Sequence, residues 1–559
     1  MKKLQVSKFV LAIILAAMLL LSACSSAATP DVSTAPPSDV APAASSEAAP
    51  ADSDNPWQVS SEPITVTGYG VISPNMVGIS SYNEIPAIQR FSEVTNLYFD
   101  WVTMATLENQ EEQLSLSFAS RNMPEIYTNM LKDTAIRYGE QGALVDLMPL
   151  IKEHAPNILA ALQKDPSTIP VNSTEDGKLF VIQQMNEDYR VSSYRIFNAQ
   201  YAWLDKLGLK APETLDELYD TLVAFRDNAA QLTDEKIIPY TTYFTNGPGS
   251  EGLGYFDVFG WPIGMYSSRG YLKDGENKLV FGALQPEFVE TMQYVRKLYA
   301  EGLMDPDLDA VRDDATFEAK MTNNRVGIAF VGQGRFPIYN SKAGEAYDDF
   351  RVLPMLPLKN KDGVPAYGGA GGLAGNGLGF SISVNCADPV AVIKALDYSF
   401  SPEGQMLFNF GIEGDTYEMV NGQPEFTDKI VANPDMAMTQ AVATLVAPSE
   451  RWACVRLYDY IKKASPPELD VYSTSLLNAG GFGPGVRRFA MGELPIPTAL
   501  IEEYAVVQTD LFTYLDESIV KFIRGDWNLD SDYDNFTATL KNMRVDDYMQ
   551  VLNDAYAKL

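Results

Sequence analysis

The stretches Ile64-Thr-Val-Thr67 and Leu97-Tyr-Phe-Asp-Trp-Val102 decide the fold class of this chain. Each alternates apolar and polar side chains, which is the pattern of a half-buried strand. Pro86 lies between them, just inside a segment that reads as a helix running to Val94. A strand, a helix and a strand at this spacing form a βαβ unit, which places both strands parallel in one sheet. We therefore predict an α/β fold.

Strands and helices continue to alternate beyond this unit. Gln113–Ser120 reads as a helix, and residues 124–128 read as the next strand. Thr214 and Glu217 have the spacing of a capping box at the start of another helix. The alternation persists to Phe330, and the last third of the chain reads as mostly helical. The body of about 500 residues exceeds what one hydrophobic core holds, so two or more lobes are expected.

The N-terminus carries an export signal. A basic start precedes an apolar run from Phe9 to Leu21 and the small residues before Cys24, as in a secretory signal peptide. Leu21-Ser-Ala-Cys24 resembles the bacterial lipobox, in which the cysteine takes a diacylglycerol and becomes the mature N-terminus; the alternative is an ordinary signal peptide with a chance cysteine. We predict a leader over residues 1–23, a disordered Ala/Pro/Ser-rich tether over 24–61, and a protein held by lipid on the extracellular face of the cell membrane.

Composition excludes several classes of function. The formal net charge is −31, so nucleic acid is not an expected partner, because binding phosphates requires a basic surface. His154 is the single histidine, and this argues against zinc chemistry and against a Ser-His-Asp triad. Cys386 and Cys454 could form a disulfide or remain free thiols. After the leader no apolar run reaches transmembrane length, so contact with the membrane is expected through the lipid alone.

Several motifs in fixed order resemble the extracellular solute-binding proteins, family 1, which serve carbohydrate ABC importers, and most of all their long lipoprotein and alginate-binding branch. They are Leu116-Ser-Phe-Ala-Ser-Arg-Asn-Met-Pro-Glu-Ile126, Trp203-Leu-Asp-Lys-Leu-Gly208, Leu298-Tyr-Ala-Glu-Gly-Leu-Met-Asp-Pro306 and Asn409-Phe-Gly-Ile-Glu-Gly-Asp-Thr-Tyr417. The resemblance implies a two-lobe periplasmic-binding-protein (Venus flytrap) fold with a helix-rich C-terminal part. It places residues 62–190 and 372–412 in the N-terminal lobe, and 191–371 and 413–559 in the C-terminal lobe.

A sugar site needs flat apolar platforms beside hydrogen-bonding groups, because a sugar ring has both C–H faces and hydroxyls. The candidate platforms are Trp261, Tyr266 and Trp452. The resemblance puts three chain crossovers near two other groups of candidates, around residues 189–194 and 411–417, and in the glycine-rich residues 367–379. With Asn129, which follows a strand end, these candidates are Gln184, Tyr189, Arg190, Glu413, Asp415 and Tyr417. Each of these side chains could equally serve plain packing.

The alginate-binding relatives carry an oxygen-rich calcium loop, and the corresponding place here is residues 227–236. The regular spacing of calcium ligands is lost, so we expect a degenerate loop in which Asp227, Asn228, Asp234 and Glu235 are the remaining candidate ligands. No other cofactor is expected.

The resemblance favours a monomeric receptor that captures a carbohydrate, most simply an oligosaccharide, and presents it to the permease subunits of an ABC importer. A secreted glycosidase with two catalytic carboxylates is the enzyme alternative. A third hypothesis keeps the binding fold but gives it a peptide or another small molecule as ligand. The acidic composition favours a neutral oligosaccharide over a uronate, although Arg190, Arg335 and Arg451 leave a uronate open.

Overall fold

The computed structural model describes residues 55–164, 168–187, 195–242, 257–265, 267–273, 278–307, 314–332, 335–366, 374–447, 452–464, 494 and 496–558. The predicted leader, Cys24 and most of the predicted tether lie outside these ranges. Among the described residues, no helix has both the length and the apolar character needed to span a membrane.

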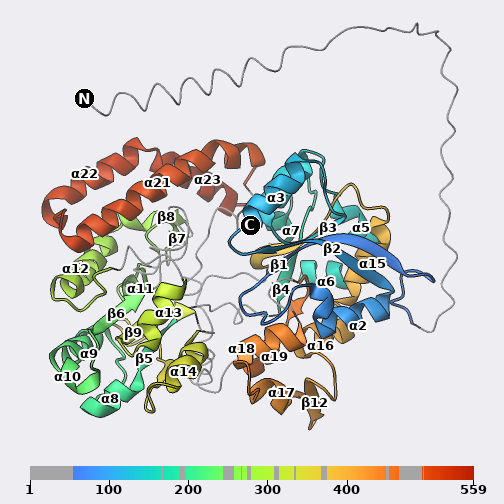
Figure 1. The fold of residues 1–559 in the computed structure, drawn as a ribbon. Coiled ribbons are helices and arrows are strands. Elements are labelled where there is room, and N and C mark those ends of the chain that lie inside the picture. Colours follow the sequence, from blue (N-terminus) through green and yellow to red (C-terminus); the bar gives the residue numbers. More distant parts are fainter. Residues whose placement is uncertain are drawn as a thin grey trace, which may run out of the picture. The chain divides into compact units, whose positions relative to one another are not determined.

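The first lobe is built on a six-stranded sheet (Figure 1). The strand order is β14 (Val455–Arg456), β4 (Ile182–Asn186), β11 (Ala374–Ile382), β3 (Ile126–Leu131), β1 (Ile64–Ile72) and β2 (Leu97–Thr106). β11 runs antiparallel to its two neighbours, and the other pairings are parallel. The parallel pair β1 and β2 confirms the βαβ unit predicted from the alternating stretches.

The helix of that unit, α2 (Pro86–Thr95), shows how the sequence sets its bounds. Pro86 occupies the first helical position, where its missing N–H costs nothing. The helix buries Ile88 and Phe91 in the first core and ends at Asn96, whose φ of 59° is left-handed. α3 (Gln110–Ala119) begins three residues before the predicted helix. Both predicted helices are therefore present.

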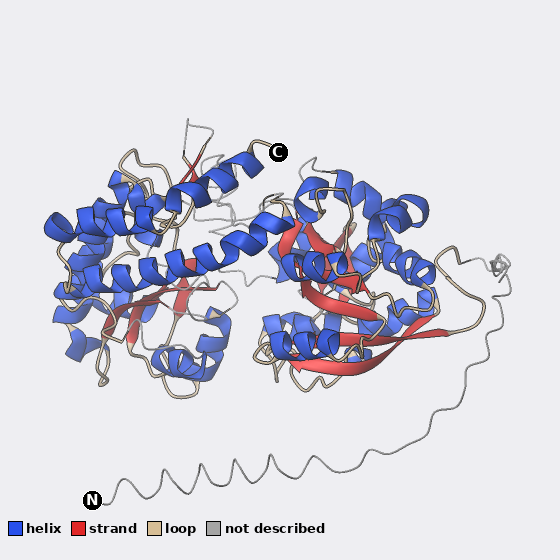
Figure 2. Cartoon of the chain, turned by 90° about the horizontal axis from the view of Figure 1, so that it is seen from above, coloured by secondary structure: helices blue, strands red, loops and turns tan. Residues whose placement is uncertain are grey.

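Helices flank the strands of both sheets (Figure 2). In the first lobe these elements include α4 (Lys132–Glu140), α5 (Leu147–His154), α6 (Pro156–Gln163), α7 (Thr168–Asn172), α15 (Pro389–Tyr398), α16 (Pro402–Phe410), α17 (Asp428–Val431), α18 (Met438–Ala441) and α19 (Tyr458–Ala464), with a hairpin of β12 (Tyr417–Val420) and β13 (Gln423–Phe426). Cys454 is buried in this lobe's core and Cys386 packs against that core. Both are free thiols, which resolves the open alternative about a disulfide.

The segment from Tyr417 to Tyr460 packs with the first lobe, whereas the sequence assigned everything after residue 412 to the second. Tyr417, Trp452 and Tyr460 belong to the same buried cluster as β1. β14 also pairs with β4, and the Met185 N–H donates to the Cys454 carbonyl at 2.9 Å. The division at residue 413 is thus wrong for this segment, because strand pairing and aromatic packing return it to the first core.

The second lobe is built on a four-stranded sheet in the order β10 (Val352–Pro354), β5 (Arg195–Gln200), β9 (Val326–Gly332) and β6 (Ile238–Thr242). β5 is antiparallel to β10 and β9, and β6 is parallel to β9. Its further elements include α8 (Tyr201–Leu207), α9 (Leu215–Asp227), α10 (Ala229–Leu232), α11 (Asp257–Gly260), α12 (Pro286–Ala300), α13 (Asp314–Thr322), α14 (Phe336–Gly344) and a two-stranded pair, β7 (Tyr271–Leu272) and β8 (Leu279–Val280). As predicted, the Thr214 hydroxyl caps α9 by accepting from the Glu217 N–H.

The C-terminal part is helical, as predicted, and contributes to the second core. It consists of α21 (Thr498–Arg524), α22 (Leu529–Asn542) and α23 (Val545–Tyr556). Leu515 of α21, Phe536 of α22 and Leu552 of α23 are all buried in one cluster with Phe288 of α12. α21 ends at Gly525, whose φ of 82° is the left-handed conformation that glycine adopts at low cost.

The end of the predicted tether is docked on the first lobe. The Trp57 ring lies 5.4 Å from the Tyr398 ring, and its indole N–H donates to Glu403 at 3.2 Å. The Asn55 amide donates to the Val94 carbonyl at 2.7 Å, and the Val59 N–H donates to the Thr95 carbonyl at 3.0 Å. The prediction of a free tether up to residue 61 is therefore wrong for its last residues, because the indole of Trp57 has apolar area to bury.

Asp516 gives the second lobe a pH-dependent stability. Its side chain is 16% exposed and pairs with Arg269 at 3.0 Å. Burial raises the pKa of Asp516 to about 6, against the attraction of Arg269 and with a further rise from Asp257. Because the folded-state pKa exceeds the unfolded value, ionisation costs stability as the pH rises between about 4 and 6.

We expect Asp516→Asn to remove this dependence. Relative to the variant, the free energy of unfolding of the wild type should fall by about 3 kcal/mol from pH 4 to pH 7. Urea denaturation at a series of pH values measures the difference. Asp510→Asn, at an exposed position on the same helix, should retain the wild-type profile. A constant difference between wild type and Asp516→Asn across this range would contradict the prediction.

Candidate ligand-binding site

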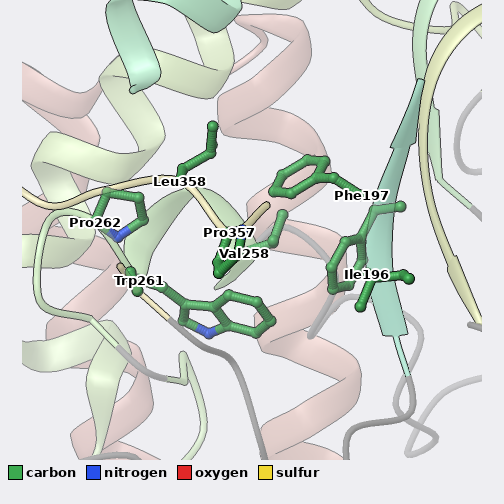
Figure 3. Close-up of a pocket in the computed structure, with 9 residues that line it drawn as sticks. Ile196, Phe197, Val258, Trp261, Pro262, Pro357 and Leu358 are labelled. Carbon is green, nitrogen blue, oxygen red and sulfur yellow. The ribbon is translucent and has the colours of Figure 1, made fainter. Parts of the chain in front are cut away.

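An apolar cavity lies where the strands of the four-stranded sheet end, on one side of that sheet's length (Figure 3). β9 and β10 both run antiparallel to β5, so their carboxyl ends meet the amino end of β5 at this edge. Open α/β sheets bind ligands beyond the carboxyl ends of their strands. The residues that line the cavity are Ile196, Phe197, Val258, Trp261, Pro262, Phe330, Pro357, Leu358 and Ala366.

Trp261 reaches the cavity from the turn after α11. Its N–H donates to the Asp257 carbonyl at 3.1 Å, and the chain then reverses so that the Met265 N–H donates to the Gly260 carbonyl at 2.8 Å. A Cβ atom on Gly260 would lie 2.7 Å from the Met265 carbonyl oxygen, so this close turn requires glycine. The Trp261 side chain is packed edge-to-face against Phe330, with ring centroids 5.6 Å apart, and the residue is 8% exposed.

Two of the predicted polar candidates lie on neighbouring parts of the six-stranded sheet. β3 and β4 flank β11 and run in the same direction. Asn129 of β3 and Gln184 of β4 therefore lie toward the same end of their strands. Asn129 has a left-handed φ of 60°, and its amide donates to the Gln110 side chain at 2.8 Å. Asparagine adopts this conformation more readily than most residues, because its short polar side chain can form local hydrogen bonds. Gln184 is 3% exposed and lies beside the Cys454 thiol, whose pKa burial raises to about 12.

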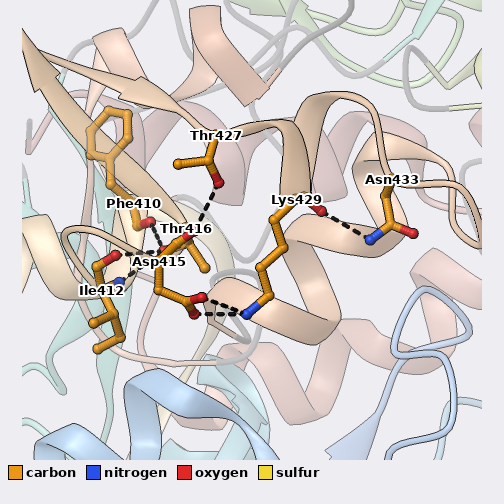
Figure 4. Close-up of polar contacts among 7 residues, drawn as sticks. All are labelled: Phe410, Ile412, Asp415, Thr416, Thr427, Lys429 and Asn433. Carbon is orange, nitrogen blue, oxygen red and sulfur yellow. Dashed lines mark hydrogen bonds and ion pairs between the residues drawn. The ribbon is translucent and has the colours of Figure 1, made fainter.

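The candidates around residue 415 form a structural turn after α16 (Figure 4). The Asp415 carboxylate accepts from the Lys429 amine at 2.7 and 2.8 Å, and its carbonyl accepts from the Thr427 hydroxyl at 2.8 Å. The Tyr417 ring is buried and lies 5.9 Å from Phe410. Glu413 is exposed at the same turn. The ring of Tyr417 therefore serves the first core, and Asp415 closes the turn.

Trp452 is a core residue, and its prediction as a ligand platform is wrong. It is 1% exposed, and its ring stacks on Phe408 with centroids 5.5 Å apart. Its indole N–H donates to the Ser399 hydroxyl at 3.1 Å, so its one polar group is satisfied inside the protein. A ligand cannot lie on a face that other aromatic rings already cover.

The remaining candidates divide into two groups. Tyr189, Arg190, Tyr266 and much of the glycine-rich run lie outside the described residues. In the degenerate calcium loop, the Asp227 carboxylate accepts from Arg226 at 2.7 Å, and Asn228 ends α9 by donating to the Ala224 carbonyl. Asp234 and Glu235 are exposed. In the part of the chain that the structure describes, no three His, Cys, Asp or Glu side chains are grouped so as to hold a metal.

Sequence reasoning found Trp261 but missed the other walls of the cavity. Phe197 and Phe330 are opposite each other in the β5–β9 register, with ring centroids 5.2 Å apart. Val258 comes from α11, and Leu358 comes from the segment that follows β10. Each looks in sequence like an ordinary core residue, and strand register is the signal that would have brought them together.

Two α/β lobes and an aromatic cavity at the carboxyl edge of a sheet are features of a ligand-binding receptor. The sequence matches the bacterial extracellular solute-binding protein family over residues 93–406. The chain belongs to this family, as its ordered motifs predicted. Membership in a family of binding proteins also supports the expectation that the chain is not an enzyme.

Individual relatives agree with this assignment. The fructooligosaccharide ABC transporter substrate-binding protein FusA of Streptococcus pneumoniae serotype 4 is 26% identical over 354 residues, which cover 60% of this chain and 61% of FusA. Lipoprotein LipO of Bacillus subtilis strain 168 is 25% identical over 365 residues, which cover 63% of this chain and 68% of LipO. The alignment thus spans less than two thirds of FusA.

Solved structures confirm the fold over nearly the whole body. The alginate-binding protein AlgQ2, solved without calcium ion, matches with a TM-score of 0.69 at 21% identity, covering 90% of this chain and 100% of AlgQ2. FusA of S. pneumoniae in complex with kestose matches with a TM-score of 0.69 at 19% identity, covering 88% and 99% of the two chains. The predicted two-lobe solute-binding fold is therefore correct.

Proposed function

We propose that this protein is the substrate-binding component of an ABC importer and that its ligand is a carbohydrate, most simply an oligosaccharide. The observation that carries the proposal is the cavity walled by Trp261, Phe197 and Phe330, since aromatic rings are the surfaces on which sugar C–H faces pack. FusA, a sugar-binding relative by name, has the same fold. Ligand capture would close the two lobes, and the closed form would dock on the permease.

The proposal includes a lipid anchor and a monomeric state. Cys24 would carry a diacylglycerol, and residues 25–54 would form the tether, since the chain contacts the first lobe from Asn55 onward. An anchored receptor stays concentrated above its permease, because a tether converts the encounter into a local one. One polypeptide supplies both lobes, so no second copy is needed to complete a site.

We expect Cys24→Ala to release the protein from the membrane. The substitution removes the thiol that receives the lipid, whereas the described body has no membrane-spanning helix to hold it. Membrane and soluble fractions of the producing bacterium, compared by immunoblot, measure the change. Cys386→Ala, in the body of the chain, is the matched control and should remain in the membrane fraction. Retention of Cys24→Ala in that fraction after removal of residues 1–23, checked by the size of the chain on the blot, would contradict the anchor.

Isothermal titration of the soluble chain from Ser25 tests the ligand class. The panel contains kestose, neutral hexose oligosaccharides and oligouronates, and each mixture is also analysed by chromatography after incubation. Reversible binding of at least one saccharide without cleavage is the expected result. Cleavage by the pure protein would establish a glycosidase instead, and binding of peptides with no saccharide bound would overturn the carbohydrate assignment.

A further inference from the structure

The connections between the two lobes meet the first lobe on three neighbouring strands. In the part of the chain that the structure describes, β4 is the last first-lobe strand before β5, β11 returns to the first lobe after β10, and β14 and α19 precede the second-lobe helix α21. β14, β4 and β11 are adjacent in the sheet, in that order. Met185 of β4 pairs with Ala374 of β11 and with Val455 of β14. The first-lobe ends of these connections therefore lie together on the sheet.

Glu187, the residue that follows β4, is held at this place by three hydrogen bonds. Its N–H donates to the Arg456 carbonyl at 2.8 Å, and its carbonyl accepts from the Lys164 amine at 2.6 Å. Its carboxylate accepts from the Tyr458 N–H at 2.8 Å. Tyr458 is the first residue of α19, so the carboxylate satisfies one of the N–H groups that a helix cannot satisfy internally.

The segment between β14 and α19 is fixed separately from the other side. The amide of Asn409, a fully buried residue of α16, donates to the Val455 carbonyl at 2.8 Å, and its oxygen accepts from the Leu457 N–H at 3.0 Å. Glu187 is exposed by contrast. Its carboxylate joins the residue at which the chain leaves β4 to the helix that leads toward α21.

The freedom of the connections enters the affinity for a ligand. A free receptor whose lobes adopt many relative orientations loses that freedom when a ligand selects one of them, and the entropy lost lowers the affinity. Restricting the connections in the free chain reduces this cost, as preorganisation does in general. Glu187 can act in this way without touching a ligand, since it is not among the residues that line the cavity.

We propose that Glu187 is a positioning residue, whose carboxylate joins two of the inter-lobe connections on the first lobe and so restricts the lobes before ligand capture. The inference rests on the proposed function, because it concerns the closure that accompanies binding. Without the hydrogen bond to Tyr458, the end of β4 and the start of α19 move independently. The free chain then samples more orientations of its lobes, and every ligand binds more weakly.

A distance measurement on the free protein tests the proposal without a ligand. Spin labels are attached to Lys152→Cys on α5 and Glu290→Cys on α12, both at exposed positions, in a soluble chain from Ser25 that also carries Cys386→Ser. Double electron–electron resonance gives the distribution of distances between the labels. We expect a broader distribution in Glu187→Ala than in the chain with Glu187.

The affinity is the second measurement. Isothermal titration with kestose and the other saccharides of the panel should give about tenfold weaker binding for Glu187→Ala, which corresponds to ordering about one further residue on closure. The loss should be similar for every saccharide that binds, because Glu187 acts on the lobes and not on one sugar group.

Asp388→Ala is the matched control. Asp388 caps α15 in the same lobe by accepting from the Ala391 N–H at 2.9 Å, so its removal takes away an equivalent hydrogen bond. It follows β11, whose other end carries Ala374 and the connection. We expect this variant to keep the distance distribution and the affinity of the wild type. Melting temperatures of both variants show whether they lose similar stability.

The results separate this proposal from the proposed function. An unchanged distance distribution in Glu187→Ala, or equal broadening in Asp388→Ala, would overturn the role of Glu187 while the receptor function stands. If the wild type binds no saccharide, the carbohydrate function is wrong, and the distributions of the free chains still decide the role of Glu187. If Glu187→Ala does not fold, Glu187→Gln replaces it, since loss of the charge weakens the same hydrogen bond. A wild-type distribution in Glu187→Gln would then overturn the proposal.

Discussion

Trp261→Ala is expected to lower the affinity for the bound carbohydrate at least about 30-fold, which corresponds to the roughly 2 kcal/mol that a buried tryptophan anchor contributes at a binding hot spot. The indole forms a wall of the cavity and is 8% exposed. Its removal would take away the apolar platform and enlarge the cavity, so that water occupies the place of the ligand. Titration with the tightest-binding saccharide of the panel measures the loss.

Two variants control this experiment. Trp261→Phe keeps an aromatic face and should retain most of the affinity. Trp527→Ala removes a partly buried tryptophan from the turn between α21 and α22 of the same lobe, where its ring lies 5.5 Å from that of Phe522 and does not line the cavity. We expect Trp527→Ala to bind as the wild type does. Wild-type affinity in Trp261→Ala would show that the indole is a packing residue and that the ligand lies elsewhere.

The parts of the fold that are set by residues close together in the sequence could be predicted. Alternation at 64–67 and 97–102, with Pro86 between them, was enough to predict β1, α2 and β2, because strand periodicity and helix capping are local properties. The assignment of residues 413–464 failed for the opposite reason. β14 joins β4 across about 270 residues of sequence, and no local pattern reports such a partner.

The same distinction explains the outcome at the candidate site. Trp261 lies in a Gly- and Pro-containing turn, where a large aromatic ring is an evident candidate for binding. Phe197 and Phe330 become cavity walls through the register of β5 and β9. Trp452 is a candidate platform in the sequence because it carries a large flat ring. Its actual environment consists of rings contributed by distant segments, which only the folded chain brings together.

Trp452 is surrounded by rings on several sides. Phe91 and Phe99 pack edge-on to it with ring centroids 5.4 and 5.6 Å away, Phe380 lies at 5.9 Å, and Phe408 stacks on it. These four residues come from α2, β2, β11 and α16. The indole therefore contacts two helices of the first lobe, α2 and α16, and two strands of its sheet, β2 and β11. Truncation at this position should affect the whole first core.

Trp452→Ala is expected to destabilise the first lobe by about 3–5 kcal/mol, the range for buried tryptophan or phenylalanine truncation, because the cavity left behind adds to the lost transfer free energy. Urea denaturation followed by far-UV circular dichroism measures the change. Trp452→Phe retains an aromatic ring and leaves the Ser399 hydroxyl without its donor, so a smaller loss is expected. If Trp452→Ala folds with wild-type stability and loses carbohydrate binding alone, the side chain is a ligand platform and its assignment to the core is wrong.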